Sequence, residues 1–111
     1  MSYIRVISTK VIAPKNLHAV SYAKKSFVNY INHLSQKASD APGFISSNSY
    51  WKKGDLNTIV SISDWTTEKK WDKWVSSPER NLIHHEYKSI IGHETFDILI
   101  KKQKKRDIFL L

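Results

Sequence analysis

The order in which hydrophobic periodicities follow one another constrains the fold of this chain more than any other feature. Alternation of apolar and polar residues predicts four strands, at residues 3–12, 44–52, 56–65 and 93–101. Apolar residues spaced three and four apart predict a long helix from about residue 15 to residue 36, between the first two strands. A second helical region separates the last two strands. The predicted order of elements is therefore βαββαβ.

The second helical region is predicted to consist of two short helices that meet at a corner. Thr67 is the expected N-cap of the first, and Trp71 and Trp74 then share one helical face. Ser77 is the expected cap of the second, with Pro78 at the first helical position, where a missing backbone N–H costs nothing. A helix break beside a face that carries two tryptophans is a suitable wall for a pocket.

A βαββαβ order with right-handed crossovers predicts an α+β fold of the ferredoxin-like type, with a four-stranded antiparallel sheet and both helical layers on one face. The other face would carry aliphatic and small polar side chains, which favours burial against a second copy and hence a homodimer. Residues 1–100 are predicted to form this single domain. Residues 101–111 are a basic and then apolar tail, whose last four residues are expected to pack on the body or on a second subunit.

The formal net charge of +8 raises the question of acidic partners. Five of the eighteen Lys and Arg residues lie within 101–106, and most of the others are expected on solvated helix faces. We therefore do not expect nucleic acid as a partner. The chain has no cysteine, no membrane span and no apolar signal segment at its start, so a cytoplasmic protein is expected.

Three short motifs resemble those of a known superfamily. Ala41-Pro42-Gly43-Phe44 leads into the second strand, the third strand ends at Trp65, and T-x-x-x-x-W-x-x-W follows at 66–74. Over roughly residues 3–100 the chain resembles the antibiotic biosynthesis monooxygenase (ABM) superfamily of dimeric α+β-barrel proteins. The resemblance implies dimerisation through the sheets and a pocket between helices and sheet. It implies either cofactor-independent oxygenation of polyphenols and quinols or, in the IsdG-type branch, oxidative degradation of heme.

The motif around the helical corner is most similar to the heme-degrading branch. That branch uses an Asn on the first strand, a Trp on the short helix, and a His ten residues later as the ligand of the heme iron. Trp74 and His84 keep this spacing, whereas Ser8 stands where the Asn is expected. The resemblance thus implies catalytic roles for Trp74 and Ser8 and heme coordination by His84. Because the Asn is missing, heme binding is better supported than heme turnover.

Other interpretations of these residues stay open. His84 could be a packing residue with His85 facing solvent, and Trp74 could belong to the core. A cofactor-independent oxygenase would instead use Trp74, His84, Asn48 or Tyr50 to orient its substrate and remove a proton. The chain contains no phosphate-cradling loop for a flavin or nicotinamide and no zinc-like ligand spacing. A dimeric ligand-binding protein without turnover is the non-enzymatic alternative.

Overall fold

The computed structural model describes residues 3–12 and 20–100 and confirms the predicted order of elements. The strands are β1 (Ile4–Ile12), β2 (Phe44–Lys52), β3 (Asp55–Trp65) and β4 (Ile91–Ile100), and the helices are α1 (Val20–Ala38), α2 (Glu68–Val75) and α3 (Pro78–Glu86). The start of the predicted first helix and the tail 101–111, with its predicted packing, lie outside the described residues.

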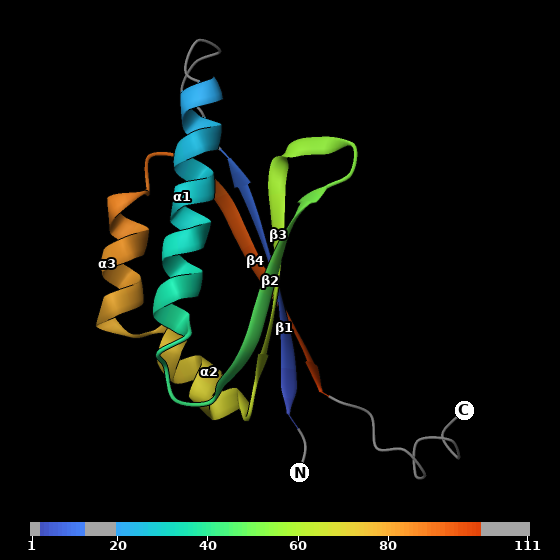
Figure 1. Ribbon diagram of the computed structural model, residues 1–111, viewed down its shortest axis with the longest axis vertical. Coiled ribbons are helices and arrows are strands. Elements are labelled where there is room, and N and C mark those ends of the chain that lie inside the picture. The colour runs from blue at the N-terminus through green and yellow to red at the C-terminus, as the bar shows by residue number, and fades with distance from the viewer. Residues whose placement is uncertain (1–2, 13–19, 101–111) are drawn as a thin grey trace, which may run out of the picture.

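The four strands form one antiparallel sheet in the order β2-β3-β1-β4, and the helices lie on one side of it (Figure 1). The predicted α+β, ferredoxin-like fold is therefore confirmed. No helix in the described ranges is long and apolar enough to cross a membrane. The side of the sheet away from the helices is here called the open face.

Both predicted helix caps form. The Thr67 hydroxyl accepts a hydrogen bond from the Lys70 backbone N–H at 3.1 Å, and the Ser77 hydroxyl accepts one from that of Arg80 at 3.2 Å. At the turn before β2, Gly43 has a φ of 87°. A Cβ there would also stand 2.7 Å from the Cβ of Lys70, so α2 packs closely against this turn only because residue 43 is glycine.

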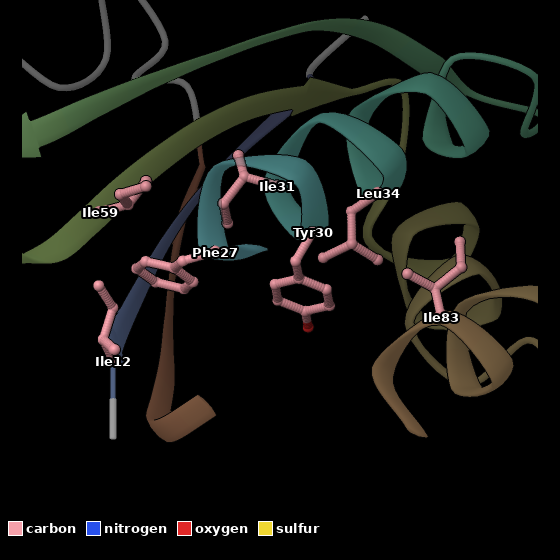
Figure 2. Packing of buried hydrophobic residues seen from close by; sticks show 7 residues of the cluster. All are labelled: Ile12, Phe27, Tyr30, Ile31, Leu34, Ile59 and Ile83. Carbon is pink, nitrogen blue, oxygen red and sulfur yellow. The ribbon is translucent and has the colours of Figure 1, made fainter. Parts of the chain in front are cut away.

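The core lies between α1 and the sheet. Figure 2 shows the side chains of Phe27, Tyr30, Ile31 and Leu34 projecting from α1, and all four are buried. A second buried cluster lies nearer α2 and contains Ile4, Val6, Ala38, Trp65 and Trp71. Helix α1 thus covers one part of the sheet and α2 another.

The helix-facing side of β1 is not entirely apolar. Every second residue of this strand from Ile4 to Ile12 is buried, and the series includes Ser8 and Lys10. Lys10 is only 4% exposed, and Arg80 on α3 is 8% exposed. Most basic residues before the tail were expected on solvated helix faces, and Lys10 and Arg80 are exceptions because the fold directs both side chains into its interior.

Candidate active site

A cavity of about 60 Å³ lies between the sheet and the helices; we call it the inner cavity. Its aromatic walls are Phe44, Trp65, Trp71, Trp74 and Phe96. Its hydroxyl groups come from Ser8, Ser35, Ser47, Ser61 and Ser63, and its aliphatic lining from Val6, Ile31, Leu34, Ala38 and Val75. Two charged residues, Lys10 and Arg80, complete the lining. Flat aromatic walls with a polar, cationic end are suited to a planar ligand that carries an oxygen substituent.

The cationic end is a cluster of Lys10, Arg80 and Glu94, here called the charged cluster. Lys10 lies opposite Glu94 in the pairing of β1 with β4, and its Nζ is 3.1 Å from a Glu94 carboxylate oxygen. From α3, Nη2 of Arg80 donates to both Glu94 oxygens, at 2.9 and 3.0 Å. The Ser77 cap fixes the first turn of α3 and so places Arg80 over this end of the sheet.

Burial and pairing shift the pKa values of this cluster. Burial lowers the pKa of the Lys10 ammonium, and the attraction of Glu94 offsets only part of this effect. Burial alone would raise the pKa of the Glu94 carboxyl, but the two neighbouring cations together bring it below its usual value. Glu94 is therefore ionised at neutral pH, and Lys10 gives up its proton more readily than a solvated lysine does.

The charged cluster packs against the aromatic wall of the inner cavity. Nζ of Lys10 and Cζ of Arg80 lie 5.7 and 5.6 Å from the centre of the Phe96 ring, which is within cation–π range. The Trp71 ring meets Phe96 edge to face, with centroids 5.3 Å apart. Ser8 lies opposite Phe96 in the sheet, and its hydroxyl accepts a hydrogen bond from Nζ of Lys10. Ser8 thus helps to orient the ammonium.

Trp74 is positioned by a second aromatic pair. Its ring stacks on that of Trp65 with centroids 6.5 Å apart, and Nε1 of Trp65 donates to the Ser63 hydroxyl at 3.0 Å. Trp65 is almost fully buried, whereas Trp74 is half-buried. Trp74 therefore rests on a fixed ring while keeping one side toward solvent.

His84 lies outside the inner cavity. Its Nδ1 is 3.1 Å from the hydroxyl of Tyr30, which projects from α1 in Figure 2. Burial and the nearby Glu94 raise the pKa of that hydroxyl, so Tyr30 stays protonated. His84 is half-buried and His85 is exposed, as the packing interpretation expects.

Comparison with known proteins identifies the family. The model of the family described as antibiotic biosynthesis monooxygenase matches residues 21–86, which include α1, the β2–β3 hairpin, α2 and α3. The chain belongs to the ABM family. No curated protein is significantly similar to it in sequence.

Solved structures with the same fold include several ABM proteins. The crystal structure of SnoaB, a cofactor-independent oxygenase from Streptomyces nogalater, has 11% identity and a TM-score of 0.77 and covers 96% of this chain and 99% of its own. A conserved protein from Methanosarcina mazei Go1 has 18% identity and a TM-score of 0.69, and the match covers 94% of this chain and 95% of that protein. A putative antibiotic biosynthesis monooxygenase from Chloroflexus aurantiacus J-10-fl has 13% identity and a TM-score of 0.69, and the match covers 91% of this chain and 94% of that protein.

A larger concave surface lies on the other side of Trp74 in this ABM protein. This outer groove has a volume of about 840 Å³ and is lined by the end of α1 and the turn after it, by α2, and by the start of α3. Four lysines line it, at positions 37, 69, 70 and 73, together with Asp40 and Glu79. Of the described residues that line the two spaces, Trp74 is the only one that lines both the inner cavity and the outer groove.

The described residues do not fit a heme held by His84. Trp74 and Ser8 line the same cavity, but His84 lines neither the cavity nor the groove. A cavity of about 60 Å³ is also far smaller than a porphyrin. Heme coordination by His84 therefore stays a prediction without support in this arrangement.

Two further candidates from the sequence, Asn48 and Tyr50, lie on the open face of the sheet, away from the inner cavity. Asn48 pairs with Ile62 and Tyr50 with Val60, whereas the intervening Ser49 shares a hydrogen bond with Ser61 on the helix side. Side chains alternate along a strand, so Asn48 and Tyr50 point to the open face. Neither residue lines the inner cavity, so their suggested role in orienting a substrate stays a prediction without support in this arrangement.

Sequence reasoning missed the charged cluster. A signal for Lys10 was present, because it falls in the same alternating series as Ile4, Val6 and Ser8. Arg80 precedes the buried Ile83 by three residues and thus shares its helical face. Glu94 gave no local signal, since only the register of β4 against β1 brings it opposite Lys10.

Proposed function

We propose that this protein is a cofactor-independent monooxygenase acting on a phenol or quinol bound in the inner cavity. The observation that carries the proposal is the pairing of aromatic walls with two buried cations at one end of the cavity. Family membership and the shared fold with the cofactor-independent oxygenase SnoaB support it. We further propose that Trp74 forms a wall against the substrate ring and that Ser8 orients the Lys10 ammonium.

The chemistry uses the substrate as the source of electrons. A phenol with a free para position can give a para-quinone: the para carbon loses hydrogen and gains one oxygen atom of O₂, and the second oxygen atom leaves as water. The substrate supplies all four electrons, so no external reductant is consumed. The phenolate gives up electrons more readily than the phenol. Fixed cations beside the phenolic oxygen stabilise this charge, and the burial of both side chains strengthens the interaction.

The cavity must widen to admit a ring. A cavity of roughly 150 Å³ accommodates benzene, whereas the inner cavity measures about 60 Å³. Trp74 is half-buried and lines both the inner cavity and the outer groove, so we propose that its rotation joins the two spaces. The other tryptophans of the wall, Trp65 and Trp71, are buried and held by the core.

Oxygen uptake tests the proposed function. Protein freed of metals would be incubated with ¹⁸O₂ and fused-ring phenols that have a free para position, beginning with 1-naphthol. We expect protein-dependent oxygen uptake and one ¹⁸O atom in the quinone, with a rate changed about tenfold or more by Trp74→Phe. Trp51→Phe is the matched control, because Trp51 packs on Phe27 and lies outside the cavity lining. A Trp74→Phe rate equal to that of the control, or no ¹⁸O in any product, would refute the proposal.

A hemin titration separates this proposal from the heme-degrading one. The ten-residue spacing of Trp74 and His84 is the observation in favour of heme. If heme were bound through His84, hemin would give a saturable Soret shift that disappears in His84→Ala. We expect no His84-dependent shift. A stoichiometric Soret shift that His84→Ala abolishes would instead support assignment of the protein to the heme-degrading branch.

We also propose a homodimer that forms through the open face of the sheet. Ile7 pairs with Ile62 in the middle of this face, Thr9 pairs with Val60, and Leu99 is 48% exposed. A sheet face with aliphatic side chains near its centre is suited to burial against a second copy. Light scattering should give twice the 12.9 kDa chain mass, and Ile62→Asp should reduce it to that of one chain. A wild-type mass of one chain would disprove the dimer.

A further inference from the structure

We infer that the charged cluster of Lys10, Arg80 and Glu94 is a binding site for one anionic oxygen, so that the inner cavity holds its phenol as the phenolate. This inference deepens the proposed function, because it names the ionisation state of the substrate and the residues that select it. Lys10 and Arg80 are specificity-determining residues in this view, and Glu94 positions both.

The charge of the cluster is unbalanced. Two buried cations face a single carboxylate, and no other carboxylate in the described ranges contacts either cation. Burying a charge without a partner is costly, and such charges in folded proteins are normally paired. With Lys10 protonated, the second cation gives the cavity an excess positive charge that a single negative charge would neutralise.

Both cations of the cluster have hydrogen-bond donors that no described residue accepts. Nη2 of Arg80 makes both contacts with Glu94, which leaves Nε and Nη1 without an acceptor among the described residues. Nζ of Lys10 donates to Ser8 and contacts Glu94, and an ammonium has three donors. Both cations line the cavity, whereas Glu94 does not. The free donors are therefore available to a ligand in the cavity.

The surroundings favour an aromatic oxyanion over a small inorganic anion. Phe96 lies beneath both cations, and Trp71 meets Phe96 edge to face. Trp74 and Trp65 extend the aromatic wall away from the charges. A phenolate would place its oxygen among the free donors and its ring against these walls. Small anions such as chloride would use only the charged end.

Equilibrium binding of two matched ligands tests the inference. 4-Nitrophenol is measured at a pH where it is ionised, and 4-nitroanisole presents nearly the same ring without charge. We expect the wild-type protein to bind the phenolate roughly tenfold or more tightly than the anisole, as a hydrogen bond to a charged group provides. Neither ligand needs to react with oxygen. The result is therefore independent of the oxygen-uptake assay, and either proposal can fail alone.

A charge series of variants assigns the preference to the cluster. Lys10→Met leaves the Arg80–Glu94 pair intact and removes the excess charge, so the phenolate preference should fall roughly tenfold while anisole affinity stays within about twofold. Glu94→Gln adds to the excess charge and should raise the preference. Lys25→Met is the matched control, because Lys25 is exposed on α1 and lies outside the cavity lining.

Thermal unfolding of each variant checks that the fold is kept. Lys10→Met tests the inference even if Glu94→Gln does not fold. Equal affinity of the wild-type protein for both ligands, a preference unchanged in Lys10→Met, or no saturable binding of either ligand would overturn the inference.

Discussion

The inner cavity and the outer groove are both cationic and share Trp74 as a wall, yet they hold their charges in opposite ways. Lys10 and Arg80 are buried, fixed by Glu94 and set over an aromatic ring. The four lysines of the groove have no ion pair within the described residues, and none of them is buried. The groove is about fourteen times larger, but the cavity has the more specific chemistry.

The two regions differ in the solvent access of their charged side chains. Charges at the surface interact in a high dielectric and are screened by salt within about 8 Å at physiological ionic strength. Charges in the cavity are screened much less, and each unpaired one carries a desolvation penalty. The groove can therefore attract an anionic ligand, whereas only the cavity can fix one oxygen of that ligand in place.

The largest expected effect is on stability and concerns Glu94, the carboxylate of the charged cluster. It tests whether the buried charges of the cavity differ from the exposed charges of the groove. Glu94→Gln leaves two buried cations without a carboxylate, and we expect it to lower the free energy of unfolding by about 3–5 kcal/mol at neutral pH. Glu79→Gln removes a carboxylate from the exposed groove and should change stability by no more than about 0.5 kcal/mol. Chemical denaturation of both variants measures the difference. Similar effects would show that the two regions do not differ in this way.

The contribution of Glu94 should also depend on pH. Its pKa in the folded protein lies below the usual value of 4.5, so its stabilising effect is complete above that pH and is lost as the pH falls through the folded-state pKa. The gap between wild type and Glu94→Gln should therefore narrow progressively below about pH 4.5. Lys10, Arg80 and the protonated Tyr30 surround this carboxylate, and none of them loses charge in that range. A gap that stayed constant as the pH fell would contradict this account.

The sequence was sufficient for the architecture because each element had its own local signal. The Ser77-Pro78 break, the Thr67 cap and the turn at Gly43 all follow from backbone preferences of single residues, and all are confirmed. Trp74 and Ser8, for which the family resemblance implied catalytic roles, both line the inner cavity, and those roles stay predictions.

The charged cluster could not be predicted in full because it depends on long-range register. Glu94 meets Lys10 only through the pairing of β4 with β1, and Arg80 reaches both from α3. His84 shows the opposite problem. Its spacing from Trp74 matches a ligand motif, but α3 turns it toward Tyr30. A motif fixes distance along the helix, whereas the packing of the helix decides which cavity a side chain enters.

The most direct test of the central claim is the ionisation of a phenol bound to the protein. Because 4-nitrophenol changes its absorption spectrum on ionisation, a pH titration with saturating wild-type protein gives the pKa of the bound ligand. We predict a pKa about one unit below that of free 4-nitrophenol, which corresponds to about 1.4 kcal/mol, and a shift that persists at high salt. A bound pKa equal to or above the free value would contradict the account. A shift that disappears in salt would assign the ligand to the outer groove instead.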